Sequence, residues 1–218
     1  MDKVGIILTT TVNVQPKAYL YQTASNERLQ CYLKSIDAWL QHTPFKIIVI
    51  ENTGYSFPET ETMTKYKDRF EIISFVEETE ESAFYLKGNP HKGSSEMFSI
   101  QYAYCHSNLL HTCDFIVKIT GRYFVPEFVE TMQKMQPLDA WDGLRQNTCD
   151  RCEIVGCSRR KFPFLFNAFL LNKEGKYDGH VENIYKWRMT QLNKVFICPV
   201  FTIEPTQMGG INYITTQL

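Results

Sequence analysis

The stretch Asp114-Phe-Ile-Val-Lys-Ile-Thr-Gly-Arg-Tyr123 decides the predicted fold. Its apolar residues predict a buried β-strand over Phe115–Ile119, and Gly121 ends the run. Arg122 and Tyr123 follow directly, so a cation and a hydroxyl group stand where the strand ends. Because ligands bind outside the carboxyl ends of strands in open α/β sheets, this segment predicts an active site.

Alternating apolar runs and helical patterns extend this prediction to the rest of the chain. Further strands are predicted over Val4–Leu8, Phe45–Ile50, Phe70–Val76, Phe164–Leu171 and Val195–Ile203. Helices are predicted over Glu27–Gln41, Ser95–Leu110, Pro126–Met135 and His180–Leu192, with Ser25-Asn26 capping the first and Ser94 or Ser95 capping the second. Strand–helix alternation up to residue 125 predicts an α/β fold with a mainly parallel sheet. The remainder predicts mixed or antiparallel strands and one packing helix.

Composition narrows the class of protein. The 218 residues are 44% hydrophobic and 22% charged, as in a soluble globular protein, and one domain over 1–218 is expected. A formal net charge of −1 argues against nucleic acid as a partner. No apolar run reaches the length of a transmembrane segment, and no secretory signal is recognised. The seven cysteines are therefore interpreted as free thiols of a cytoplasmic protein.

Polar clusters follow the first four predicted strands. They are Thr9-Thr10-Thr11, Glu51-Asn52-Thr53, the segment from Lys87 to Glu96, and Thr120–Tyr123. In a parallel sheet all four would meet at one edge, although strand ends are polar in many proteins. The segment Lys92-Gly93-Ser94-Ser95-Glu96 offers backbone NH groups and a lysine to an anion, or else simply begins a helix beside an exposed lysine.

The order of four motifs resembles the GT-A family of nucleotide-sugar-dependent glycosyltransferases. The motifs are Ile6-Ile-Leu-Thr-Thr-Thr11, Ile48-Val-Ile-Glu-Asn52, His91-Lys-Gly-Ser-Ser-Glu-Met97 and Ile116-Val-Lys-Ile-Thr-Gly-Arg-Tyr123. In particular, they resemble those of small enzymes from large DNA viruses and from bacterial surface-polysaccharide clusters. The resemblance covers roughly residues 3–190. It implies a Rossmann-like, GT-A-like domain with a nucleotide-binding half (1–125) and an acceptor-binding half (126–218).

The resemblance also implies a donor site for a nucleoside-diphosphate sugar, expected to be a UDP-sugar, and a glycan hydroxyl as acceptor. Thr9, Thr10 and Thr11 would meet the nucleoside, and Glu51 with Asn52 would contact base or ribose. The remaining donor-site residues would be Lys92, Gly93, Glu96, Lys118, Thr120, Gly121, Arg122 and Tyr123.

One departure from the family pattern concerns the metal. Most GT-A enzymes hold a divalent ion with an Asp-x-Asp pair, and this chain contains no Asp-x-Asp. Lysine, threonine and arginine make a poor site for Mg²⁺ or Mn²⁺. We therefore expect no required cofactor and no metal ligands, with Arg122 stabilising the leaving diphosphate with help from Lys92 or Lys118. A divalent ion such as Mn²⁺ or Mg²⁺ stays open as an alternative.

A catalytic base for an inverting transfer is sought at the start of a late helix, where the resemblance places it. Glu182 in Gly179-His-Val-Glu-Asn183 has that place, or else it complements the positive end of the helix. Asp142 is the second candidate base, because Trp141 beside it could stack on an acceptor sugar. His180 is a third candidate, as a base, a metal ligand or an acceptor-site group, or else it is an ordinary surface histidine.

Two other functions and one metal site remain as alternatives. A sugar nucleotidyltransferase would need a glycine- and arginine-rich signature after the first strand, which Thr9–Pro16 lacks. A non-catalytic module that binds nucleotide sugars is compatible with the missing acid pair. Cys149, Cys152 and Cys157 have spacings that suggest zinc, but a fourth ligand would have to come from His180 or Cys198.

Overall fold

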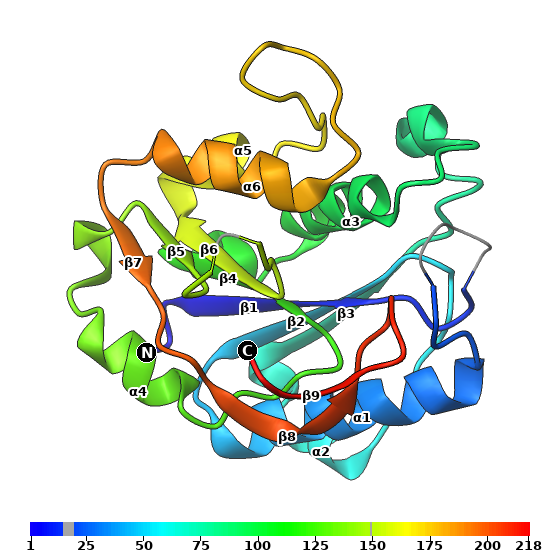
Figure 1. Ribbon diagram of the computed structural model, residues 1–218. Coiled ribbons are helices and arrows are strands. Elements are labelled where there is room, and N and C mark those ends of the chain that lie inside the picture. The colour runs from blue at the N-terminus through cyan, green and yellow to red at the C-terminus, as the bar shows by residue number, and fades with distance from the viewer. Residues whose placement is uncertain (15–19, 149) are drawn as a thin grey trace.

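A seven-stranded sheet forms the centre of the protein (Figure 1). The computed structural model describes residues 1–14, 20–148 and 150–218. The sheet contains β1 (Val4–Thr10), β2 (Lys46–Glu51), β3 (Phe70–Ser74), β4 (Phe115–Thr120), β5 (Gly143–Arg145), β6 (Ile154–Ser158) and β7 (Val195–Ile197), in the order β3-β2-β1-β4-β6-β5-β7. Only β6 runs antiparallel to both of its neighbours. The predicted α/β fold with a mainly parallel sheet is confirmed.

Helices cover both faces of this sheet. They are α1 (Ser25–His42), α2 (Glu61–Lys65), α3 (Lys92–His106), α4 (Phe128–Lys134), α5 (Phe162–Leu165) and α6 (Val181–Thr190). Short 3₁₀ turns lie at η1 (Lys67–Arg69), η2 (Glu81–Leu86), η3 (Leu110–Thr112), η4 (Leu138–Ala140) and η5 (Arg159–Lys161). In Figure 1, α3, α5 and α6 lie on one face and α1, α2 and α4 on the other. A hairpin of β8 (Thr202–Gln207) and β9 (Ile214–Gln217) lies on the same side of the sheet as α1.

The central strand β1 shows why both faces need cover. Its side chains alternate between two cores: Val4, Ile6 and Leu8 pack on the α1 side, and Ile7 packs on the α3 side. All four are fully buried, as expected of a strand in the middle of a parallel sheet. A continuous apolar run therefore predicted this strand correctly, and β2 and β4 follow the same rule.

Some local predictions were wrong. The run Phe164–Leu171 was expected to be a strand, but its first residues belong to α5, which has a proline in its first turn. The helix α1 begins at Ser25 after Ala24, with no side-chain cap, and α3 begins at Lys92, three residues before the predicted start. The run Val195–Ile203 is divided between β7 and β8. Two helices, α5 and α6, stand where one was expected.

Within residues 1–14, 20–148 and 150–218, every helix is too short or too polar to cross a lipid bilayer.

Candidate active site

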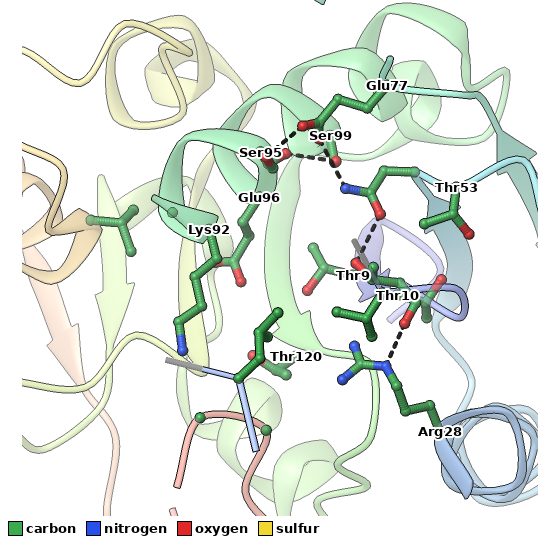
Figure 2. Close-up of a pocket in the computed structure, with 18 of the residues that line it drawn as sticks. Thr9, Thr10, Arg28, Thr53, Glu77, Lys92, Ser95, Glu96, Ser99 and Thr120 are labelled. Atoms are coloured by element: carbon green, nitrogen blue, oxygen red, sulfur yellow. Dashed lines mark hydrogen bonds between the residues drawn. The ribbon is translucent and has the colours of Figure 1, made fainter. Parts of the chain in front are cut away.

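A cavity of about 1020 Å³ opens at the carboxyl ends of β1, β2 and β4 (Figure 2). Residues from all four polar clusters line it: Thr9, Thr10, Thr11, Asn52, Thr53, Lys87, Lys92, Gly93, Glu96, Thr120, Arg122 and Tyr123. The predicted convergence of the strand ends on one edge is therefore confirmed. Its volume is at the upper end of the range for small-molecule sites, so it can hold a ligand of nucleotide-sugar size.

A chain of hydrogen bonds joins the ends of β1 and β2 along one wall. Thr11 Oγ1 donates to Asn52 Oδ1 at 2.8 Å, and Asn52 Nδ2 donates to Glu77 Oε2 at 3.0 Å. Ser95 Oγ donates to the other Glu77 oxygen at 2.7 Å, which joins α3 to the network. Figure 2 shows Glu77 and Ser95 side by side at the start of α3. The network fixes the orientation of the Asn52 amide at the predicted nucleoside end.

Glu51 does not line the cavity, although it was expected to contact base or ribose. Its side chain is fully buried, and its two oxygens accept hydrogen bonds from Val12 N, Thr53 N, Thr53 Oγ1 and Tyr55 N. These four bonds hold the turn after β2 against the segment after β1. Glu51 therefore shapes the wall that presents its neighbour Asn52.

Helix α3 brings Lys92 and Glu96 to the opposite wall, where Figure 2 shows both side chains projecting from the first turns of the helix. Gly93 lets this helix start lie close to α6. A Cβ atom at Gly93 would stand 2.8 Å from the Cβ of Val181, the first residue of α6. The starts of the two helices are thus in direct contact at the cavity.

Lys118 does not line the cavity. Its side chain is fully buried, and its ammonium group lies 2.5 Å from Glu96 Oε1 and 2.8 Å from the carbonyl oxygen of Cys152. Burial alone would lower the pKa of Lys118, but Glu96, together with Cys152 and Glu153, outweighs it and raises the pKa above its ordinary value. Lys118 therefore contacts Glu96 from outside the cavity, and its position does not provide the predicted contact with a diphosphate.

The end of β4 contributes Thr120, Arg122 and Tyr123 to the lining. Gly121 between them lies against β1, since its amide donates to Thr9 O at 2.9 Å. A Cβ atom there would stand 2.7 Å from that same oxygen, so the close approach of the two strand ends requires glycine.

A second guanidinium group, which the sequence did not predict, shares the cavity with Arg122. Arg28 on α1 is only 5% exposed and donates to Thr11 O at 2.6 Å, Gln22 O at 3.0 Å and Tyr32 Oη at 2.7 Å. Burial lowers the pKa of Arg28 most, the phenol of Tyr32 opposes this, and the nearby Arg122 lowers the pKa further. Two positive charges are thus held close together in one wall.

Arg122 is itself positioned by two acceptors. Its Nη1 donates to Gln22 Oε1 at 2.9 Å and to Gln207 O at 3.1 Å. Within the described part of the chain, neither Arg28 nor Arg122 forms an ion pair with a carboxylate. The positive charge of this wall is therefore available to an anionic ligand.

Carboxylates from two other elements line the cavity as well. Glu182, in the first turn of α6, accepts a weak hydrogen bond from Cys152 Sγ at 3.7 Å. Glu153, the residue before β6, was not predicted from the sequence, and its Oε2 is buried without a hydrogen-bond partner among the described residues. The backbone of Glu153 accepts from Thr120 N at 2.9 Å, which places it beside the end of β4.

His180 lies immediately before α6 and is exposed. It lines a smaller neighbouring cavity of about 350 Å³ together with His91, Lys92 and Glu182, and the two imidazole rings have centroids 6.1 Å apart. The predicted acceptor-site histidine is therefore next to the main cavity and is not in its wall.

Asp142 and Trp141 lie at the other edge of the sheet. Asp142 precedes β5, which runs parallel to β4 because β6 pairs antiparallel with both, so it stands at the end opposite the cavity. Its carboxylate accepts from Arg160 Nη2 at 2.9 Å and from Asn193 N at 3.1 Å. Trp141 donates its indole NH to Met135 O and packs edge-on against Phe196. The structure does not bring this predicted pair to the site.

Among the described residues, no three His, Cys, Asp or Glu side chains are grouped so that they could hold a metal ion. Cys149, part of the suggested zinc cluster, lies outside the described residues, while Cys157 and Cys198 are buried thiols whose pKa burial raises. The residues at the end of β4 do not fit a divalent ion bridging two phosphates.

Two solved structures overlap most of the chain at low similarity. One, described as a candidate nucleotide-diphospho-sugar transferase from Desulfovibrio desulfuricans G20, has a TM-score of 0.47 and 14% identity over 91% of this chain and 80% of that chain. The other, a nucleoside-diphosphate-sugar pyrophosphorylase from Vibrio cholerae RC9, has a TM-score of 0.42 and 12% identity over 89% and 91%. No protein-family model and no curated protein sequence matches. Both TM-scores are below 0.5, so neither structure assigns a function to this chain.

Proposed function

We propose that the protein transfers a sugar from a nucleoside-diphosphate sugar to a hydroxyl group of a glycan. A UDP-sugar is the first donor to test. The observation that carries the proposal is the pair Arg28 and Arg122 in the wall of a cavity of about 1020 Å³, with no carboxylate paired to either among the described residues. A diphosphate is a dianion or trianion that complements two such groups. The resemblance of the four strand-end motifs to glycosyltransferases supports the same assignment.

The two guanidinium groups have N–H donors left to bind phosphate oxygens. A guanidinium has five N–H donors. Among the described residues, the bonds given above use three of the Arg28 donors, which leaves two, and they use Nη1 of Arg122, which leaves its Nε and Nη2. Planar guanidinium groups bind phosphate oxygens bidentately, so the two together can neutralise the charge that develops on a leaving diphosphate.

The proposed reaction uses Glu182 as the base. Its carboxylate takes the proton of the acceptor hydroxyl, whose oxygen attacks the anomeric carbon from the face opposite the diphosphate. The bond from that carbon to the phosphate oxygen breaks, and its electron pair leaves with the nucleoside diphosphate. The products are an inverted glycoside, the nucleoside diphosphate and a protonated Glu182, which returns its proton to water.

An assay with a panel of nucleotide sugars tests the proposal. Protein is mixed with each donor and a set of glycan acceptors, and thermal stability and release of nucleoside diphosphate are followed, with and without EDTA. Selective stabilisation with slow release of UDP, unchanged by EDTA, is expected. Loss of turnover in EDTA that Mn²⁺ restores would contradict the role of the arginines as the charge-neutralising groups.

Two other outcomes of the same experiment would replace the proposal. Formation of pyrophosphate from UTP and a sugar phosphate would identify a nucleotidyltransferase. Binding of nucleotide sugars with no turnover across all acceptors and in water would identify a binding module.

A further inference from the structure

We infer that Gln22 is a positioning residue that sets the spacing of Arg28 and Arg122 and keeps their combined charge available to a diphosphate. This inference rests on the proposed function, because it assigns the arginine pair to the donor's phosphates. Gln22 lies before α1, is 7% exposed, and was not among the residues that the sequence pointed to.

One residue holds both guanidinium groups. The backbone oxygen of Gln22 accepts from Arg28 Nη1 at 3.0 Å, and its side-chain Oε1 accepts from Arg122 Nη1 at 2.9 Å. Its amide nitrogen points to Cys31 Sγ at 3.9 Å, which leaves the amide oxygen facing Arg122. The two arginines come from α1 and from the end of β4, so Gln22 joins two elements that are far apart in sequence.

The neutrality of the amide matters as much as its hydrogen bond. Arg122 already disfavours the charged form of Arg28, so the pair is electrostatically unfavourable until an anion lies between or beside the two groups. A carboxylate at position 22 would make a stronger hydrogen bond to Arg122, and it would also cancel one positive charge. A glutamine holds the same geometry and leaves both charges for the ligand.

The hairpin of β8 and β9 also contacts Arg122. Gly209 in its loop accepts a hydrogen bond from Tyr21 N at 2.8 Å, and Gln207 O accepts from Arg122. A Cβ atom at Gly209 would stand 2.5 Å from Arg122 Nη2, so the loop lies directly on the guanidinium. In Figure 1 this hairpin and α1 lie on the same side of the sheet.

The variants Gln22→Glu and Gln22→Met separate positioning from packing. Gln22→Glu keeps the acceptor and the size, so folding is expected to be unchanged or stronger, while the affinity for inorganic pyrophosphate and for UDP falls tenfold or more. Gln22→Met keeps only the size and is expected to bind both probes several-fold more weakly. Gln30→Glu, the same substitution at an exposed position of α1, is the matched control and is expected to bind as the wild type does.

Calorimetry with pyrophosphate, UDP and uridine gives the decisive comparison. Affinity for pyrophosphate and UDP that falls in Gln22→Glu, with uridine binding and melting temperature retained, supports the inference. Wild-type affinity of Gln22→Glu for pyrophosphate would overturn it. If the wild type binds pyrophosphate in a Gln22-dependent way but releases no nucleotide from any donor, the proposed function fails. The inferred role of Gln22 in binding the anion is then retained. Failure of the wild type to bind either phosphate probe overturns both.

Discussion

The ammonium group of Lys118 lies 2.5 Å from Oε1 of Glu96, and the two partners are buried unequally. The lysine side chain is fully buried, whereas the glutamate side chain is 25% exposed at the cavity. Removing one partner of a buried ion pair leaves an uncompensated charge, which costs about 3–5 kcal/mol when that charge cannot reach water. The cost should therefore depend on which partner is removed.

Glu96→Gln should destabilise the fold more than Lys118→Met. The first change leaves a buried ammonium whose remaining hydrogen-bond partners among the described residues, Thr120 Oγ1 and Cys152 O, are neutral, and about 3–5 kcal/mol is expected. The second leaves a carboxylate that can be hydrated from the cavity, so a smaller loss is expected. The double variant should be more stable than Glu96→Gln alone. Urea unfolding of the four proteins measures this, and equal losses in the two single variants would contradict the unequal burial.

The same pair predicts a loss of stability in alkali. Because the folded-state pKa of Lys118 is raised above its ordinary value of 10.5, its contribution is complete below that pH and is lost as the pH rises through the folded pKa. Tyr85 and Tyr123, whose pKa burial raises to about 12, also favour unfolding above pH 10. The free energy of unfolding of wild type minus that of Lys118→Met removes this background. The difference should shrink above pH 10.5, and a difference independent of pH would refute the assignment.

Gly209→Ala should impair donor binding without unfolding the protein. The new methyl group would stand 2.5 Å from Arg122 Nη2, and the guanidinium is the flexible end of a side chain, so it would move at small cost to the fold. Affinity for UDP is expected to fall about tenfold, while the melting temperature changes little. Gly175→Ala is the matched control, because no atom lies within 4 Å of its added carbon, although its φ of +72° makes that substitution strained. An unchanged affinity in Gly209→Ala would show that the loop does not set Arg122.

Asp142→Asn should weaken the fold and leave the chemistry intact. Burial would raise the pKa of Asp142, but the amide of Asn193 and the cations Lys161 and Arg160 outweigh it and lower the pKa. Its stabilising contribution is therefore present above its ordinary value of 3.8 and lost as the pH falls through the folded pKa. A loss of about 1–3 kcal/mol at pH 7 is expected from the weakened hydrogen bonds. Turnover per folded molecule should stay near wild type. A hundredfold loss of turnover would make Asp142 a candidate catalytic base again.

The buried strands could be predicted because their sequences are continuous apolar runs, and β5 and β6 could not because they are not. Gly143–Arg145 is three residues long, and Ile154–Ser158 contains Gly156, whose added Cβ would stand 2.9 Å from Val117 Cγ2. Their pairing depends on neighbours distant in sequence. In Phe164–Leu171, an apolar run predicted a strand, whereas Pro163, in the first turn of α5, is typical of a helix start.

The candidate site was predictable where it follows strands and unpredictable where it comes from helices and loops. Thr9, Asn52 and Thr120 follow apolar runs, so their meeting was expected from sheet topology. Arg28 stands on a helix four residues before Tyr32, and one signal was available: a charged residue in line with the buried face. Gln22 and Gly209 gave no signal, because only the folded hairpin brings them to Arg122.

Glu182→Gln should abolish transfer and leave donor binding intact. As a base, Glu182 contributes about 10²–10⁴-fold to the rate, and the amide cannot take a proton. UDP affinity should stay within about twofold of wild type, since Glu182 stands in the first turn of α6 and the diphosphate is assigned to Arg28 and Arg122. Single-turnover rates with a UDP-sugar and calorimetry with UDP measure the two effects separately.

The matched substitution for this test is Glu153→Gln, in a second acidic side chain of the wall, whose Oε2 is buried without a hydrogen-bond partner among the described residues. It removes the same charge from the same cavity, and it should lower the rate far less if Glu182 is the base. The opposite ranking would assign proton transfer to Glu153. Equal large losses with lowered melting temperatures in both would show that the carboxylates hold the starts of α6 and β6 in place. A rate loss confined to Glu182→Gln, at constant UDP affinity and constant stability, is the result that the proposed chemistry requires.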